Sequence, residues 1–200
     1  MITKQVVRIV QLITIIPARV LLSVIIKSSH DRLLKDHITR NGKYVLVANH
    51  SGALDPIVIC YSFKFLLSAS LTPWRFFVSN KFFNNVFFLP VLYLFGCFRA
   101  RQEQHRKSGL KYALRLIDNN QNLVIFPEGK VSKFDERILP HTGVETLANY
   151  GDVQLIPARV RWNRQKGLWK SYSLAIGKPF SGKNMTAEQI MDVVYSLKFR

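Results

Sequence analysis

Short, unbroken apolar runs that end in turn residues constrain the fold of this chain more than any other feature. The run KYVLVA occupies residues 43–48, and the run NLVIF occupies residues 122–126 just before Pro127-Glu128-Gly129. Such runs, rich in β-forming residues and without polar alternation, are typical of strands buried on both faces of a parallel sheet. Two further strands are predicted over VQLIPARVRW, residues 153–162, and YSLAIGKPF, residues 172–180.

Helical patterns alternate with these strands. Residues 105–120 carry apolar side chains at helical spacing, and residues 186–199 predict a closing helix with Thr186 as its cap. Strands that alternate with helices indicate an α/β fold whose largely parallel sheet is flanked by helices. We expect this α/β domain to occupy residues 31–200, since a chain of 200 residues is long enough for one core.

Residues 1–30 predict a separate, membrane-associated helical segment. The stretch from Gln5 to Ile26 is mostly aliphatic but is interrupted by Arg8, Pro17 and Arg19. An arginine in the middle of a span costs about 2.5 kcal/mol or more, so a crossing helix is disfavoured. We predict two amphipathic pieces that bend near Pro17 and lie in the membrane interface. The alternative is a helix that packs on the core.

The charge of the chain narrows its partners. A formal net charge of +17 accompanies 48% hydrophobic residues, a proportion too high for a disordered basic protein. Nucleic acid and anionic lipid both fit such a surface. The stretch KGLWKSY, residues 166–172, offers aromatic and basic groups to bases, but we read it as an exposed hairpin. No nucleic-acid-binding motif accompanies it, so membrane lipids are the expected partner and nucleic acid is not.

Two further groups of residues are read as structural. Cys60 and Cys97 form neither a metal-ligand spacing nor a disulfide framework, so buried thiols in a reducing compartment and no metal site are expected. Eight of the fourteen phenylalanines fall in the stretch from Phe76 to Phe98. They are either core residues or an apolar wall for a long ligand.

A histidine and a carboxylate follow the first apolar run, in NHSGALDP, residues 49–56. Active groups of parallel sheets tend to lie just beyond the carboxyl ends of the strands. His50 and Asp55 are too far apart for one helix face, so they would straddle a turn, with Pro56 in the first turn of the next helix. A carboxylate on one ring nitrogen would orient the histidine as a general base. The alternative is that Asp55 only caps a helix and His50 is a surface residue.

The turn after the second run holds Glu128. Pro-Glu-Gly is ordinary tight-turn chemistry, so this signal is weak alone. A functional Glu128 would accept a hydrogen bond from a substrate hydroxyl.

Together, these stretches resemble the motifs of the glycerolipid acyltransferase family, the lysophosphatidic-acid acyltransferase-like enzymes. The first family motif, Asn-His, four residues, Asp, is matched by NHSGALD, residues 49–55. The third, Phe-Pro-Glu-Gly-Thr-Arg-Ser, is matched in part by FPEGKVS, residues 126–132. The second and fourth resemble GCFRAR, residues 96–101, and LIPARV, residues 155–160. The order and separation of the four agree, and the resemblance covers nearly the whole chain.

The resemblance implies a mixed α/β sheet entered through an N-terminal helical segment on the membrane surface. It implies an O-acyltransferase that needs no cofactor and moves an acyl chain from acyl-CoA or acyl-ACP (acyl carrier protein) to a lysolipid hydroxyl. By position, His50 resembles the general base and Asp55 its orienting partner. Arg101 or Arg99 resembles the phosphate-binding arginine. The acceptor-binding turn is matched by Glu128, Gly129 and Lys130.

The chain departs from the family where Lys130-Val131 replaces Thr-Arg, because a valine cannot bind phosphate. The resemblance implies lysophosphatidic acid as the first choice of acceptor, and this departure makes another lysolipid or an unusual hydroxylated lipid the alternative. A non-enzymatic basic module that binds membrane or nucleic acid is the third hypothesis. We expect the protein to be associated with the membrane, on the cytoplasmic face of the inner or plasma membrane.

Two points of chemistry complete the prediction. A covalent mechanism on Ser51 is disfavoured, because adjacent residues usually point apart and no Gly-x-Ser-x-Gly turn occurs. The oxyanion of the tetrahedral intermediate needs N–H donors, and the turn backbone near Gly129 or beside Pro127 is a candidate to supply them.

Overall fold

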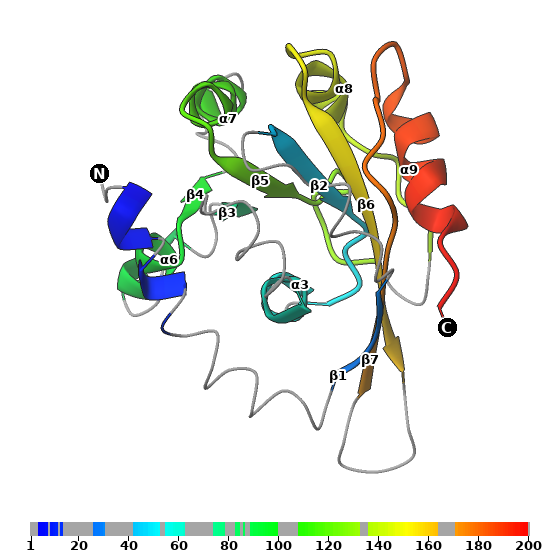
Figure 1. Ribbon diagram of the computed structural model, residues 1–200. Helices are drawn as coiled ribbons and strands as arrows, with labels where there is room; N and C mark the ends of the chain where they lie inside the picture. The colour runs from blue at the N-terminus through cyan, green and yellow to red at the C-terminus, as the bar shows by residue number, and fades with distance from the viewer. Residues whose placement is uncertain are drawn as a thin grey trace.

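A seven-stranded sheet organises the molecule, with strand order β1-β7-β6-β2-β5-β3-β4 (Figure 1). The computed structural model describes residues 4–7, 9–11, 13, 26–30, 42–52, 55–62, 74–78, 83–84, 86, 89–99, 108–132, 136–163 and 171–199. The strands are β1 (Ile26–His30), β2 (Tyr44–Ala48), β3 (Trp74–Val78), β4 (Cys97–Arg99), β5 (Asn122–Ile125), β6 (Gln154–Asn163) and β7 (Ser171–Ile176). The helices are α3 (Asp55–Ser62), α6 (Leu89–Leu94), α7 (Ser108–Asp118), α8 (Gly143–Ala148) and α9 (Ala187–Ser196).

Strand direction confirms the predicted mixed, largely parallel sheet. Neighbouring strands are parallel throughout, except that β6 and β7 are antiparallel. The central strand β2 is buried over its whole length, as the run KYVLVA predicts. It lies between β5 and β6, with Val47 paired to Ile125 on one side and to Pro157 on the other.

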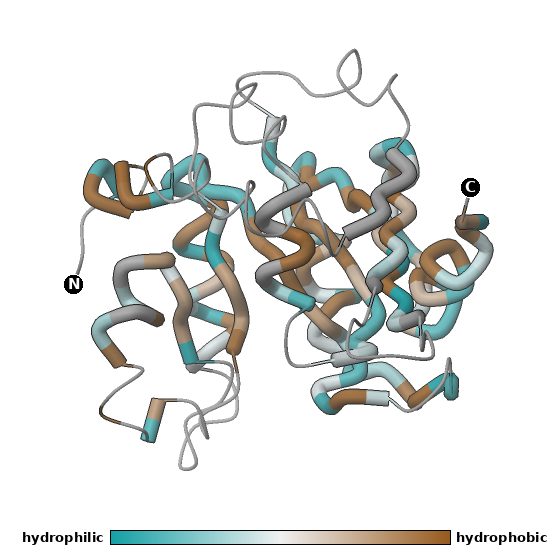
Figure 2. The backbone as a smooth tube through the Cα atoms, turned by 90° about the horizontal axis from the view of Figure 1, so that it is seen from below, coloured by the Kyte–Doolittle hydropathy of each residue, from teal (hydrophilic) through white to brown (hydrophobic). Residues whose placement is uncertain are grey.

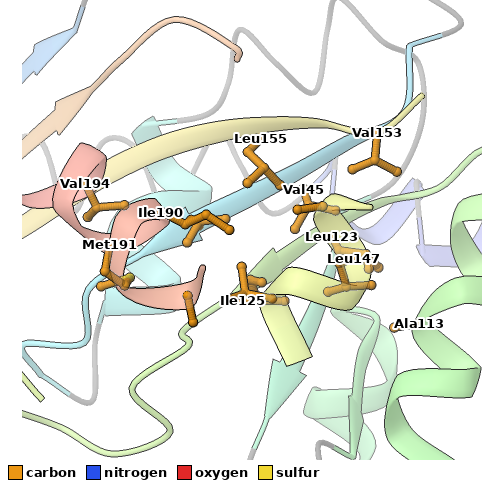
Figure 3. Packing of buried hydrophobic residues seen from close by; sticks show 14 of the residues in the cluster. Val45, Ala113, Leu123, Ile125, Leu147, Val153, Leu155, Ile190, Met191 and Val194 are labelled. Carbon is orange, nitrogen blue, oxygen red and sulfur yellow. The ribbon is translucent and has the colours of Figure 1, made fainter. Parts of the chain in front are cut away.

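Each face of the sheet buries a separate apolar cluster, because successive side chains of β2 point to opposite faces. Leu46 packs with Val58 and Ile59 of α3 on one face. Val45 packs on the other face, which α7, α8 and α9 cover (Figure 3). A fully buried Leu or Ile contributes about 1.5–3 kcal/mol, so both layers hold β2 in place.

Three described phenylalanines of the phenylalanine-rich stretch belong to the core. Phe76, Phe83 and Phe98 are buried. The ring of Phe98 meets those of Phe77 and Tyr112 edge-on, at centroid distances of 4.7 and 5.2 Å. Of the two interpretations of the stretch, core packing therefore holds for these residues. Cys97 is partly buried, and burial raises the pKa of its thiol to about 12.

The closing helix α9 begins as the sequence predicts. The Thr186 hydroxyl accepts from the backbone N–H of Gln189, and the Gln189 side chain accepts from the backbone N–H of Thr186. This reciprocal capping box satisfies N–H groups that a helix start leaves without partners. Ile190, Met191 and Val194 then face the sheet (Figure 3).

The N-terminal region corrects one prediction. Residues 1–30 are not helical throughout, because Ile26–His30 forms β1, which pairs with β7 in parallel. β6 pairs with one edge of β7. The backbone N–H and C=O groups on the other edge need partners as well, and the extended segment Ile26–His30 provides them. The sheet thus takes in residues before the expected boundary at 31. The predicted bend near Pro17 and most of the stretch 166–172 lie outside the described residues.

Residues 4–7, 9–11 and 13, the N-terminal helical residues, pack near α6 and carry alternating hydrophobic and hydrophilic positions (Figures 1 and 2). Val7 is fully buried, and the buried Gln11 side chain donates from Nε2 to the carbonyls of Trp74 and Phe95 at 2.7 and 3.0 Å. These contacts fix the segment to the start of β3 and to the turn before the edge strand β4. None of the helices in the described ranges has the length and apolar character to cross a bilayer.

Candidate active site

Strand register brings the two sequence motifs together. β2 and β5 are parallel neighbours, with Val47 level with Ile125. His50 and Glu128 each come three residues after these paired positions, so both lie at the carboxyl ends of adjacent strands. This is the edge of a parallel sheet at which functional groups gather.

His50 and Asp55 face each other, as their spacing predicts. Nδ1 of His50 lies 2.9 Å from Oδ2 of Asp55. Asp55 is fully buried and also accepts from the backbone N–H groups of Ser51 and Gly52, at 2.5 and 2.8 Å. Because an ionised carboxylate only accepts, the His50 proton lies on Nδ1 and the neutral ring presents Nε2 as an acceptor.

The aromatic ring of Phe126 supports the other side of the imidazole. The two rings stack at a centroid distance of 4.5 Å and an interplanar angle of 29°. The His50 side chain remains 18% exposed, and no described residue bonds its Nε2. The ring is therefore oriented by a carboxylate through Nδ1, while Nε2 has no partner among the described residues.

The backbone of His50 is held from both sides by the turn that follows β5. Its N–H donates to Oε2 of Glu128 at 2.9 Å. Its carbonyl accepts from the backbone N–H and the hydroxyl of Ser132, at 2.7 and 3.1 Å. The turn thus fixes the main chain that carries the imidazole.

Asn49 joins this site to β6. Its side chain is fully buried, donates from Nδ2 to the Val160 carbonyl at 2.9 Å, and accepts from the Val160 N–H at 2.7 Å. This bidentate contact replaces backbone pairing where β2 ends. The asparagine of the NHSGALD motif therefore locks the residue before His50 to the sheet.

Glu128 is a buried carboxylate with protein partners on both oxygens. It is 2% exposed, and its other oxygen, Oε1, accepts from the hydroxyl of Tyr195. Burial raises the pKa of Glu128, while the hydrogen bonds from Tyr195 and from the His50 backbone act in the opposite direction. Direct contact between Glu128 and an acceptor stays a prediction.

Gly129 serves the shape of the turn, and its own N–H is already engaged within that turn. Its φ of +65° lies in the left-handed region, and an added Cβ would come within 2.7 Å of the His141 ring. Its N–H, however, donates to the Phe126 carbonyl at 3.0 Å. Because this donor closes the turn, the Gly129 N–H does not serve an oxyanion.

A pocket of about 500 Å³ opens beside the turn. It lies next to the exposed Gly129 and Lys130, two of the residues expected at the acceptor. Its lining is formed by Glu128, Gly129, Lys130, Glu136, Arg137, Ile138, Leu139 and His141.

Of the two candidate phosphate-binding arginines, the structure describes only Arg99, which lies away from His50. Arg99 ends the edge strand β4, which β5 and β3 separate from β2. Three strand spacings correspond to about 14 Å, and the Arg99 guanidinium lies 5.3 Å from the ring centroid of Phe83. Arg101 lies outside the described residues.

Sequence reasoning missed the supporting roles of Asn49, Ser132 and Tyr195. For Asn49 the signal was present, since a buried amide directly after a strand must find backbone partners. Tyr195 offered no local signal, because its contact with Glu128 spans 67 residues. In the described part of the chain, no group of three or more His, Cys, Asp or Glu side chains is arranged to hold a metal ion.

Comparisons with known proteins agree with this geometry. A family model described as Acyltransferase matches residues 33–161, which include both motifs of the site. The crystal structure of the 1-acyl-sn-glycerophosphate (LPA) acyltransferase PlsC from Thermotoga maritima is similar to this chain, with a TM-score of 0.62 and 17% identity. The match covers 94% of this chain and 75% of that one, and at this identity it shows the fold. No curated protein matches the sequence.

Proposed function

Because this chain belongs to the acyltransferase family and is an acyltransferase enzyme, we propose that it transfers a fatty acyl chain from a thioester to a lysolipid hydroxyl. The donor would be acyl-CoA or acyl-ACP. The observation that carries the proposal is the contact of 2.9 Å between His50 Nδ1 and Asp55, which leaves Nε2 toward the substrate. The family membership predicted from the motifs is confirmed.

The proposed reaction needs one base and no covalent enzyme intermediate. Nε2 of His50 takes the hydroxyl proton while the lipid oxygen attacks the thioester carbonyl. Collapse of the tetrahedral intermediate breaks the carbon–sulfur bond, and the departing thiolate receives the proton from His50. Base assistance of this kind contributes about 10²- to 10⁴-fold to the rate. Asp55 stabilises the imidazolium that forms between the two proton transfers.

We propose lysophosphatidic acid as the acceptor, bound from the side of Gly129 and Lys130. The pocket beside the turn supports this, since the basic residues Lys130 and Arg137 line it, although the Arg137 guanidinium also bonds the Asp192 carboxylate at 2.8 Å. The name of the similar structure, an LPA acyltransferase, points the same way. A second candidate is a lysolipid with a less anionic headgroup. It is favoured by the exposed Val131 and by Glu136, which offsets one cation of the lining.

We propose that the protein works on the membrane surface, on the cytoplasmic face of the inner or plasma membrane. Val6, Ile9 and Ile13 of the N-terminal helical residues are 41%, 54% and 67% exposed. Their spacing of three and four places them along one side of a helix. Exposed apolar side chains on a helix anchored through Val7 and Gln11 suit insertion into the headgroup boundary.

Thiol release tests the function directly. Purified protein would be given a long-chain acyl-CoA or acyl-ACP together with a panel of lysolipids in detergent micelles, and free thiol would be measured over time. We expect release that depends on a lysolipid and is fastest with lysophosphatidic acid. Thiol release without any acceptor, in a burst, would contradict direct transfer.

The base is tested by His50→Ala. We expect a loss of about 10²-fold or more in kcat, because the hydroxyl loses its proton acceptor. Unchanged unfolding in urea would show that the variant is folded. His141→Ala is the matched comparison. Because His141 lines the proposed acceptor pocket without contacting Asp55 in any described interaction, its loss should raise the KM for the lysolipid and leave kcat largely unchanged. Full turnover by His50→Ala would end the mechanism.

A further inference from the structure

The buried carboxylate behind His50 receives a hydrogen bond from the last helix of the chain. Glu128 links two groups that are distant in sequence, the His50 backbone N–H on Oε2 and the Tyr195 hydroxyl on Oε1. Neither oxygen faces solvent to any extent, since the residue is 2% exposed. Both hydrogen-bond donors described for the Glu128 carboxylate are therefore groups of the protein itself.

Tyr195 is itself firmly placed. Its side chain is buried, and the guanidinium groups of Arg137 and Arg159 lie 4.9 and 5.7 Å from its ring centroid. Arg159, in β6, also donates to the carbonyls of Tyr195 and Leu197 at 2.8 and 3.0 Å. These contacts tie the end of α9 to the strand that also holds Asn49. The hydroxyl of Tyr195 thus reaches Glu128 from a fixed position.

We propose that Tyr195 is a positioning residue, whose hydroxyl fixes the Glu128 carboxylate so that this carboxylate can hold the backbone of His50. Tyr195 does not touch the reacting atoms. It acts through Glu128, which in turn acts through the main chain that carries the imidazole. The inference rests on the proposed function, and it gives Glu128 a role inside the protein besides the predicted contact with an acceptor.

The groups around Glu128 determine how loss of the Tyr195 hydroxyl changes the pKa of the Glu128 carboxyl. The groups facing Glu128 are His50 and Asp55 from the segment after β2 and Tyr195 from α9. Lys130, Glu136, Arg137 and His141 line the pocket on its outer side. Removal of the Tyr195 hydroxyl takes away a donor that stabilises the ionised carboxylate, so the pKa of Glu128 rises further above its ordinary value.

The decisive variant is Tyr195→Phe, which keeps the ring and deletes one oxygen. We expect kcat to fall roughly tenfold with KM for either substrate changed less than twofold, because a misplaced base affects the chemical step. The acidic limb of the pH–kcat profile should move to higher pH. Tyr150→Phe is the matched control, since its hydroxyl also donates to a carboxylate, that of the exposed Asp118. That control should leave kcat and the profile unchanged.

A second variant separates positioning from simple packing. In Glu128→Gln the side-chain oxygen can still accept from the His50 N–H, and the amide can donate to the Tyr195 oxygen. Adding Tyr195→Phe to this neutral background should leave the pH profile unmoved. An equal loss of activity and an equal profile shift in both backgrounds would overturn the proposal. So would a wild-type profile for Tyr195→Phe alone.

One readout does not depend on turnover. In ¹⁵N-labelled protein the amide proton of His50 should shift upfield in Tyr195→Phe and stay in place in Tyr150→Phe, because its bond to Glu128 weakens in the first variant only. If the wild-type protein transfers no acyl chain but the amide shift occurs, the proposed function fails while the positioning contact stands. An unmoved His50 amide in Tyr195→Phe would refute the positioning role itself.

Discussion

The single carboxylate of Asp55 both shapes the turn after β2 and orients the His50 ring. Its oxygens accept from the N–H groups of Ser51 and Gly52, which shapes the turn after β2, and from the His50 ring. One buried group thus provides both the turn that precedes α3 and the orientation of the imidazole. The spacing of five residues between His50 and Asp55 is what this turn requires.

Replacement of Asp55 by asparagine tests its role in orienting the His50 imidazole. We expect Asp55→Asn to lower kcat by about 10²- to 10⁴-fold, because the imidazolium loses its counter-charge and the ring loses its fixed tautomer. Asp118→Asn, which alters the exposed carboxylate bonded to Tyr150, should retain wild-type kcat. The measurement is steady-state thiol release. Retention of full activity by Asp55→Asn would reduce Asp55 to a structural role.

Glu128 gives a pH-dependent signature in stability. Burial raises its pKa in the folded state above the ordinary value of 4.5. A raised carboxyl pKa means that the folded state binds the proton more tightly, so its contribution to stability is present at low pH and is lost as pH rises through the folded pKa. Between those two pKa values the wild type should therefore lose stability relative to Glu128→Gln.

The free energy of unfolding of both proteins, measured in urea at a series of pH values, checks this sign. The difference between wild type and Glu128→Gln should decline as pH rises above 4.5 and level off once Glu128 is ionised in the folded state. A difference that grows with pH would mean that the hydrogen bonds from Tyr195 and His50 outweigh burial.

At the scale of elements, the strands with unbroken apolar runs were predictable and the rest of the sheet was not. β2, β5, β6 and β7 fall within the runs that the sequence marks, and α7 and α9 match the helical periodicity. β1 was missed because its sequence, IKSSH, has no apolar pattern that would indicate a strand. The segment is extended because it pairs with β7, and local sequence does not show that pairing. β3 and β4 were hidden in the phenylalanine-rich stretch, where apolar residues satisfy helix and strand patterns alike.

The same limit applies to the site. His50 and Glu128 were predictable because each follows a strand whose pattern is local. Their alignment depends on the pairing of Val47 with Ile125, which no local pattern fixes. The clamp of Ser132 on the His50 carbonyl and the bond from Tyr195 depend on it as well.

The N-terminal helical residues carry a prediction of their own. Ile9→Ser with Ile13→Ser should reduce co-sedimentation with lipid vesicles by roughly tenfold or more, because two exposed apolar side chains are lost from the proposed contact. Leu139→Ser, another exposed apolar side chain but beside the turn, is the control. In the Ile9→Ser, Ile13→Ser double variant, turnover of a lysolipid presented in detergent micelles should change little. Vesicle binding by this double variant equal to that of the wild type would refute the proposed contact surface.

At the scale of the whole molecule, the net charge of +17 predicts attraction to anionic bilayers. Each basic group near such a surface contributes about 1 kcal/mol, and salt screens this contribution over about a Debye length. Binding to vesicles that contain phosphatidic acid or phosphatidylglycerol should weaken steeply between low and physiological salt. Binding to phosphatidylcholine vesicles should be weaker and nearly independent of salt. Release from every membrane by nucleic acid at moderate salt would favour the binding-module hypothesis instead.

The clamps around His50 leave the imidazole almost no room to travel. Its main chain is bonded at the N–H and at the carbonyl, its ring is bonded to Asp55 and stacked on Phe126, and the residue before it is locked to β6. For the proposed reaction, a base held in this way leaves every adjustment during docking to the acceptor. The distance between the hydroxyl and the headgroup of that acceptor would then decide whether its oxygen comes within reach of Nε2.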